Sequence, residues 1–170
     1  MAVLIVGSIA YDSVRSPEGS IDRALGGSAT YGGLSCRFVQ NLSKEGTTGL
    51  VGVVGEDFAE NDRHVLSSAG LNLAGLEVAE GETFRWEGSY QGAMAEAETL
   101  ATHLNVFEHF QPAVPAELAS PRVLFCANLH PDLQRSVMDQ TTPDRLTMLD
   151  SMNLWICLLY TSPSPRDQCL

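Results

Sequence analysis

The sequence predicts an α/β fold built on a parallel sheet. Four short apolar runs lack polar alternation, which is typical of strands buried on both faces, and they lie at 2–6, 50–54, 122–127 and 146–149. Stretches with helical spacing separate these runs. Strands that alternate with helices favour parallel pairing. A chain of 170 residues can form one domain with a substantial core.

The first half of the chain supplies two of these strands and two helices. Gly7 and Ser8 end the opening strand, and Pro17-Glu18-Gly19 marks a turn between two short extended pieces within 13–25. A helix is expected from Ser28, which suits the N-cap position. The strand 50–54 is closed by Gly55-Glu56-Asp57, and a second helix is expected from Asp57 to Ala69.

Aromatic residues at strand spacing follow between 82 and 90. Phe84, Trp86 and Tyr90 share one face of the expected strand. This face could pack on the domain or form a flap over a ligand. Beyond a loop at 112–118, the sequence predicts the strand 122–127, a helix from Asp132 to about Gln140, and the strand 146–149, which ends at Asp150.

Charge and composition exclude several classes of function. The 21 acidic residues outnumber the 10 basic ones, which gives a formal net charge of −11 and no general attraction for nucleic acid or anionic membranes. No apolar run approaches the 18 residues of a spanning helix, and the first residues do not resemble a signal peptide, so a cytoplasmic protein is expected. The four cysteines form no CxxC pair, and no metal site is predicted.

Polar side chains that follow the parallel strands are the first candidates for a site. Ligands of open parallel sheets bind outside the carboxyl ends of the strands. Asp12 lies just past the first strand, Asn128 follows the third, and Asp150 ends the fourth. The Asp12 carboxylate could accept hydrogen bonds from vicinal hydroxyl groups, or it could only form an Asx turn. Asp150 could face the same crevice or only cap its strand.

The glycine residues indicate one possible ligand-binding turn and disfavour several other kinds of site. Gly26-Gly27 before a helix lets the backbone approach a ligand, although such a pair can also be only a turn. The chain contains no GxGxxG, GxxxxGK[ST] or GxSxG motif, which disfavours a dinucleotide site, a P-loop and a hydrolase nucleophile elbow.

Four ordered segments together resemble the PfkB/ribokinase family of carbohydrate and nucleoside kinases. They are VGSIAYD at 6–12, GGSATY at 26–31, VGVVGEDF at 51–58 and LDSMNLWI at 149–156. The resemblance implies a three-layer α/β/α sandwich with a small β-sheet lid, whose strands would lie at about 13–25 and 82–91. Residues 1–156 would then be the N-terminal part of a sugar kinase domain, truncated after its N-terminal half.

The resemblance also implies roles for individual residues. Substrate would be bound by Asp12, Gly26, Gly27, Ser28 and Asn128. The lid would carry Phe84, Trp86 and Tyr90, and Asp150 and Asn153 would lie near the crevice of phosphoryl transfer. Ribokinase-type chains have a Lys in place of Ser28 and an amide residue in place of Tyr31, which argues against ribose as the substrate.

The family's catalytic Asp and its nucleotide site belong to a GAGD-containing half that this sequence lacks. The resemblance therefore implies no catalytic residue here, and implies ATP and Mg²⁺ as cofactors of a full-length parent that would bind this chain poorly. Residues 157–170, CLLYTSPSPRDQCL, look like a non-native, adapter-derived tail, with a disordered terminus as the alternative.

The function expected from the resemblance is ATP-dependent phosphoryl transfer to a sugar hydroxyl in the parent protein, with this chain inactive alone. The alternative is a non-catalytic module that binds a sugar or nucleoside. The expected partners are such a small molecule and a second copy joined through the lid, without nucleic acid or membrane. An unstable product with an exposed sheet edge is a third reading.

Overall fold

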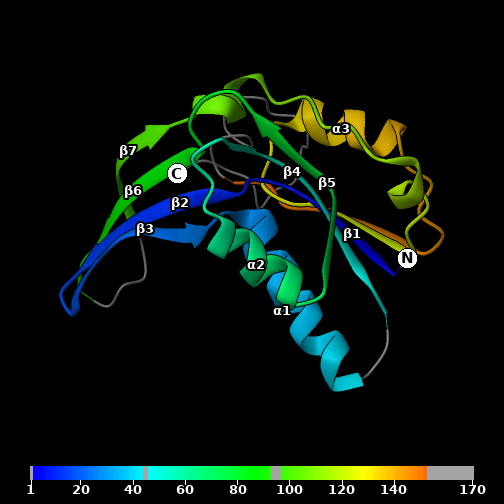
Figure 1. The fold of residues 1–170 in the computed structure, drawn as a ribbon, viewed down its shortest axis with the longest axis horizontal. Helices are drawn as coiled ribbons and strands as arrows, with labels where there is room; N and C mark the ends of the chain where they lie inside the picture. The colour runs from blue at the N-terminus through cyan, green and yellow to red at the C-terminus, as the bar shows by residue number, and fades with distance from the viewer. Residues whose placement is uncertain (1, 44–45, 93–96, 153–170) are drawn as a thin grey trace, which may run out of the picture.

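The computed structural model describes residues 2–43, 46–92 and 97–152, and it confirms the α/β class. Two sheets are present (Figure 1). The main sheet is wholly parallel, in the order β5-β4-β1-β8-β9. Its strands are β1 (Val3–Val6), β4 (Thr48–Gly55), β5 (Leu71–Ala79), β8 (Val123–Cys126) and β9 (Leu146–Leu149).

The second sheet, called the small sheet below, extends from one end of the main sheet (Figure 1). Its order is β3-β2-β6-β7, with a parallel β2–β6 pair between two antiparallel pairs. The strands are β2 (Ala10–Ser16), β3 (Gly19–Gly26), β6 (Phe84–Tyr90) and β7 (Ala97–His103). The expected turn at Pro17-Glu18-Gly19 joins β2 and β3.

Helices cover both faces of the main sheet and make three layers. On one face, Ile5 and Leu50 pack with residues of α1 (Ser28–Ser43) and α2 (Glu60–Ser68). On the other, Leu4 and Val51 pack with residues of α3 (Pro131–Asp139), the short helix η2 (Ala116–Leu118) and the chain after η1 (Asn105–His109). Successive residues of β1 are buried on opposite sides, which explains its uninterrupted apolar sequence.

The expected boundaries need two corrections. The second helix begins at Glu60 and not at Asp57, because Asp57 belongs to a turn in which Phe58 N donates to Gly55 O. Ser28 is the first residue of α1 and not its N-cap, since Tyr31 N donates to Gly27 O and the Ser28 hydroxyl bonds elsewhere.

Strands β5 and β7 were not predicted from the sequence. Both are edge strands; most residues of β7 are exposed, and β5 mixes exposed with partly buried residues along its length. Exposed edge strands need no apolar alternation, so their sequences give a weak signal.

Within the described ranges, no helix is both long enough and apolar enough to cross a membrane. Asn153 and the expected tail at 157–170 lie outside the described residues.

Candidate functional site

The order of the main sheet defines where a ligand would bind. The chain passes from β1 to β4 on one side and later to β8 on the other, so the connections reverse direction at β1. In open α/β sheets, the carboxyl ends of the strands at such a reversal form the ligand crevice. Gly7 and Ser8 follow β1 there, and Ala127 lies beside them, with its amide donating to Val6 O at 2.8 Å.

Two serines join this strand end to the start of α1. Ser8 N donates to Ser28 Oγ at 3.2 Å, Ser28 N donates to Ser8 Oγ at 3.0 Å, and the two hydroxyls are 3.1 Å apart. Gly27 between them has a φ of +95°, and a Cβ at this position would overlap Ser8 O. Only glycine therefore fits this close approach without strain. The expected Gly26-Gly27-Ser28 segment is thus fixed against the end of β1.

The Asp12 carboxylate lies against this segment. A Cβ at Gly26 would overlap Asp12 Oδ2, so the missing side chain makes room for the carboxylate. Burial raises the pKa of Asp12 above its ordinary value, and a hydrogen bond from the Gly27 amide offsets part of the rise. Among the described residues, this amide is the hydrogen-bond partner found for the carboxylate, which leaves acceptor capacity for a ligand.

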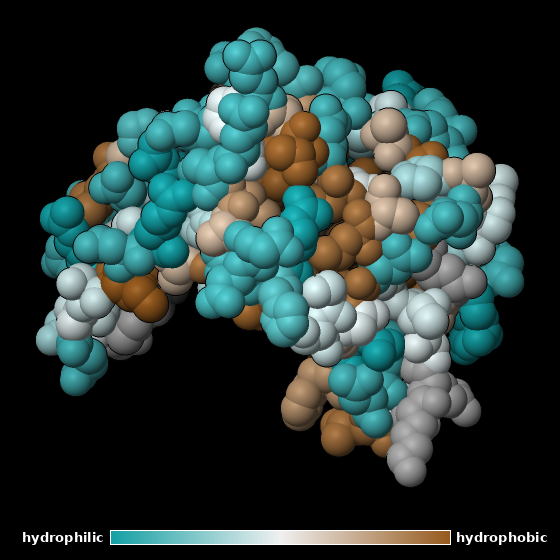
Figure 2. Space-filling view, in the orientation of Figure 1, coloured by the Kyte–Doolittle hydropathy of each residue, from teal (hydrophilic) through white to brown (hydrophobic). Residues whose placement is uncertain are grey.

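The face of the small sheet that carries Asp12 also carries Trp86. The two residues are paired in the parallel β2–β6 register, so their side chains share a face. Trp86 lies over Gly88, where a Cβ would overlap the indole ring, and Trp86 Nε1 donates to Thr99 Oγ1 at 3.2 Å. The prediction of a strand through Trp86 is therefore confirmed, whereas a lid role for its aromatic residues stays a prediction. The surface is hollowed between the tip of the small sheet and the projecting end of α1 (Figure 2).

Phe84 and Tyr90 differ from Trp86 in their surroundings. The Phe84 ring stacks on Phe107 at 5.3 Å between centroids, and Phe107 stacks on Phe110 of the core at 5.8 Å. The aromatic face was expected either to pack on the domain or to form a flap over a ligand. Phe84 packs on the domain. Tyr90 is half-buried at the other end of β6.

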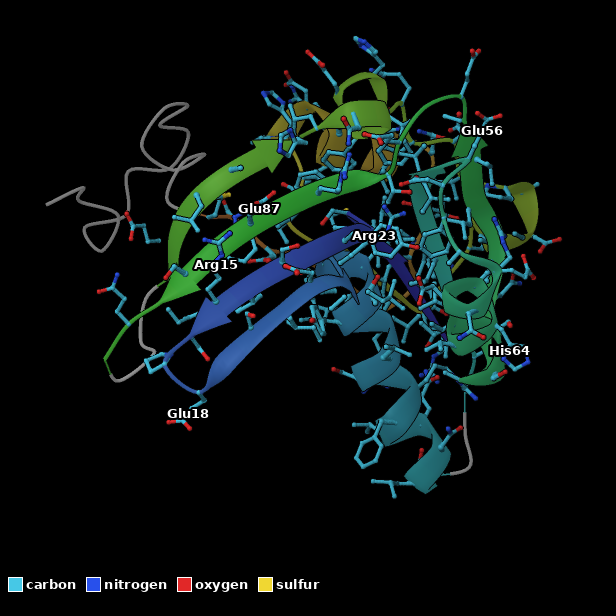
Figure 3. The ribbon with its side chains drawn as sticks, turned by 60° about the vertical axis from the view of Figure 1, so that its left-hand side comes forward. Arg15, Glu18, Arg23, Glu56, His64 and Glu87 are labelled. Atoms are coloured by element: carbon cyan, nitrogen blue, oxygen red, sulfur yellow. The ribbon has the colours of Figure 1, made fainter. Side chains whose placement is uncertain are left out.

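The opposite face of the small sheet contains a polar network that was not predicted. Tyr11 is 2% exposed, and its hydroxyl donates to Asp62 Oδ2 at 2.7 Å and accepts from Ala59 N at 2.9 Å. The Arg23 guanidinium lies 4.3 Å from the centre of the Tyr11 ring and forms an ion pair of 2.8 Å with Asp57. Figure 3 shows Arg23 at the base of the small sheet.

Asp57 connects this network to β6. Its Oδ1 accepts from Thr83 N and from Thr83 Oγ1, both at 2.7 Å, and Thr83 Oγ1 accepts from Gly55 N at 3.0 Å. Burial opposes the charge on Asp57, but the hydrogen bonds from Thr83 and the ion pair with Arg23 outweigh it and lower the pKa of Asp57. Arg23 lies 34 positions before Asp57, so no local sequence pattern could have indicated this pair.

Asn128 and Asp150 lie at the neighbouring strand ends. Asn128 Nδ2 donates to Met152 Sδ at 3.4 Å. The Asp150 side chain is exposed, whereas its backbone is held, with N donating to Cys126 O at 2.9 Å and O accepting from Gln134 Nε2 at 2.8 Å. Their roles in a site remain predictions.

Metal-ligating groups do not gather in the described part of the chain. No three His, Cys, Asp or Glu residues in it are grouped so that they could hold a metal ion. Burial raises the pKa of Cys126 to about 11, so this thiol is neutral at physiological pH.

Comparisons with known proteins identify the fold. No family model matches the sequence, and no curated protein matches it. Among solved structures, a nucleoside kinase of Methanocaldococcus jannaschii, an archaeal member of the ribokinase family, has 18% identity and a TM-score of 0.60 over 88% of this chain and 52% of its own. A ribokinase of Cryptococcus neoformans, solved with ADP, has 19% identity and a TM-score of 0.59 over 87% and 50%.

A nucleoside kinase of Burkholderia thailandensis, solved with inosine, has 18% identity and a TM-score of 0.60 over 82% of this chain and 47% of its own. The chain thus spans about half the length of these solved structures. At such identities the similarity is one of fold. The fold is ribokinase-like, as the four sequence segments implied, and it is that of sugar and nucleoside kinases.

Proposed function

We propose that this chain supplies the acceptor-binding part of an ATP-dependent small-molecule kinase. A sugar or nucleoside would bind between the small sheet and the carboxyl edge of the main sheet, with one hydroxyl presented for phosphoryl transfer. The ribokinase-like fold supports the class of activity, since sugar and nucleoside kinases share it.

The observation that carries the proposal is the position of the Asp12 carboxylate. It lies beside two glycines at the start of α1, partly withdrawn from water, with acceptor capacity to spare. A carboxylate can accept hydrogen bonds from two adjacent hydroxyl groups, and such bonds strengthen where water is excluded. These properties suit recognition of a vicinal diol.

The small sheet would act as a lid over the ligand. The face shared by Asp12 and Trp86 also carries the apolar residues Val14 and Ile21 by register. Closing an apolar surface over the acceptor excludes water that would otherwise compete in phosphoryl transfer. Edge strands β3 and β7 of the same sheet could also pair with a second copy, and this dimer stays a prediction.

ATP would supply the transferred phosphoryl group, and Mg²⁺ would neutralise its charge. Among the described residues, no three His, Cys, Asp or Glu side chains are grouped so that they could hold a metal ion, and we name no Mg²⁺ ligand in this chain. We therefore assign this chain the binding and orientation of the acceptor and no step of the transfer itself. Because such a kinase draws on ATP, we place the protein in the cytoplasm.

Calorimetric titration with pentoses, hexoses and nucleosides, inosine included, tests the proposal. We expect saturable heat with at least one of them, and its loss in Asp12→Asn. If none of the three classes gives heat, the proposed site is wrong.

The alternative is a binding module without catalysis, because the geometry at Asp12 and Gly26 concerns ligand binding and not phosphoryl transfer. Incubating the chain with the bound ligand, labelled ATP and Mg²⁺ tests the binding-only alternative. Phosphorylated product excludes the binding-only alternative. Binding without product agrees with either an acceptor-binding part or a binding module, and the gene's full reading frame then decides between them.

A further inference from the structure

We propose that Asp57 anchors the small sheet to the main sheet, with Thr83 and Arg23 as its two attachment points, and thereby positions Asp12 over the site. In this role Asp57 is a positioning residue, because its contacts are with the protein and not with the acceptor. The positioning of a ligand-binding Asp12 rests on the proposed function, whereas the anchoring of the sheet does not.

The location of Asp57 is the first step of the argument. It lies in the turn after β4, at the carboxyl edge of the main sheet, and it belongs to neither sheet. Its two carboxylate oxygens are used separately, with Oδ1 accepting from Thr83 and Oδ2 pairing with Arg23. Thr83 immediately precedes β6, and Arg23 belongs to β3. The Asp57 side chain, which follows a strand of the main sheet, therefore contacts both β3 and the residue before β6 in the small sheet.

The backbone of β3 is shaped to deliver Arg23 to this position. The register of β2 and β3 shifts between Asp12 and Val14, which is a β-bulge, and Arg23 lies in the bulge with a φ of +55°. Arg23 N donates to Ser13 Oγ at 3.1 Å, which supports this conformation. A non-glycine residue in the left-handed region costs free energy, so a compensating contact is expected, and the Asp57 ion pair and the Tyr11 ring provide it.

The anchor lies close to the site residue in sequence and space. Asp12 pairs with Ala24 in β3 and with Trp86 in β6, so it is flanked by the two strands that Asp57 holds. Tyr11, its neighbour in the chain, points the other way and contacts Arg23. A change in the tilt of β3 or β6 at this end of the sheet would therefore move the Asp12 carboxylate relative to the start of α1.

The test uses the 170-residue chain with Trp155→Phe, so that Trp86 is the single indole reporter. The variants are Arg23→Met, Asp57→Asn, their double variant and Asp57→Ala. Arg63→Met is the matched control, because it breaks another exposed Arg–acid pair, with Glu60, within α2. Amide exchange in β2 and β3 and Trp86 fluorescence are measured without ligand, and inosine and ribose affinities are measured separately.

We expect Arg23→Met and Asp57→Asn each to raise exchange in β2 and β3 about two- to fivefold, because the ion pair is partly exposed. The double variant should match Arg23→Met, since that substitution already removes the ion pair together with the Arg23 contacts to Asp57 O and to the Tyr11 ring. Asp57→Ala, which also removes the acceptor for Thr83, should exceed tenfold and alter Trp86 fluorescence. Arg63→Met should change neither signal.

Amide exchange that stays unchanged in Arg23→Met and Asp57→Asn, or that rises as much in Arg63→Met, would overturn the anchor. Arg23 is largely exposed, so Arg23→Met keeps the test decisive if Asp57→Ala fails to fold. If the unmodified chain binds neither probe while exchange responds as expected, the anchor stands and the ligand site must be reassigned. If it binds a probe and exchange does not respond, the anchor is wrong and the ligand site stands.

Discussion

Asp12 and Asp57 are two carboxylates at the same end of the molecule with opposite energetic roles. Burial raises the pKa of Asp12, so its ionised form is less favourable in the folded chain than in the unfolded one. Hydrogen bonds from Thr83 and the ion pair with Arg23 lower the pKa of Asp57 despite its burial, so its charge stabilises the fold. A carboxylate whose ionised form is disfavoured by burial is typical of a binding group. A carboxylate whose ionised form is stabilised by hydrogen bonds and an ion pair is typical of a structural group.

Asp12→Asn should therefore keep or increase stability while it abolishes ligand binding. Because the folded-state pKa is raised, the protonated form contributes stability below the unfolded pKa, and this is lost as pH rises through the folded pKa. The neutral side chain of the Asp12→Asn variant would not lose stability as pH rises, and its amide oxygen can still accept a hydrogen bond from Gly27 N. Thermal unfolding from pH 4 to 8 checks this. A melting temperature at pH 7 that falls in the variant would contradict the assignment.

Gly26→Ala should weaken binding with little effect on the fold. The new methyl group would overlap the Asp12 carboxylate and force it to rotate, and we expect affinity to fall at least about tenfold, or about 1.4 kcal/mol. Gly32→Ala, within α1, is the control. A Cβ at Gly32 would lie 3.4 Å from the Phe125 ring, which is an ordinary van der Waals contact. Equal affinities of the two variants in a calorimetric titration would show that Gly26 makes no room for Asp12.

At the scale of the elements, the sequence predicts strands well where burial is complete. The interiors of β1, β4 and β8 were identified because their apolar runs face a helix layer on both sides. The edge strands β5 and β7 were not predicted, since their exposed and partly buried positions form no uninterrupted buried run. In the site, the sequence segments indicated Asp12 and Gly26-Gly27. They could not indicate the contacts of Tyr11, whose partner Asp62 lies 51 positions later.

The contact of Tyr11 with α2 gives a prediction at this scale. Tyr11→Phe removes the acceptor for Ala59 N and the donor to Asp62, so it should lower the free energy of unfolding by about 1–2 kcal/mol. Tyr31→Phe on the exposed side of α1 makes the same chemical change at a residue 58% exposed and should cost less than about 0.5 kcal/mol. Urea unfolding compares them, and equal costs would contradict the role of Tyr11.

At the scale of the whole molecule, β9 and α1 each expose several large apolar side chains. Strand β9 is the edge of the main sheet opposite β5, and Leu146, Met148 and Leu149 on it are exposed. Helix α1 exposes Phe38, which is 67% exposed, and Leu42. An edge strand with uncovered apolar side chains is a site for association with another chain.

This surface predicts that the chain associates with itself as its concentration rises. Met148→Lys places a charge on the edge strand and should lower the apparent association constant severalfold without changing the unfolding midpoint by more than about 0.5 kcal/mol. Sedimentation velocity over a hundredfold concentration range measures the association of the unmodified chain and of Met148→Lys. A monomer at every concentration in the unmodified chain would show that β9 is not a contact surface.

The most direct test of the proposed site is to follow backbone amides and the Trp86 indole by NMR during titration with inosine and with ribose. Binding beside Asp12 predicts saturable shifts of Gly26, Gly27 and the Trp86 indole proton, and their disappearance in Asp12→Asn. Shifts confined to residues elsewhere, or no saturable shift with either probe, would contradict a ligand site between the small sheet and the carboxyl edge of the main sheet.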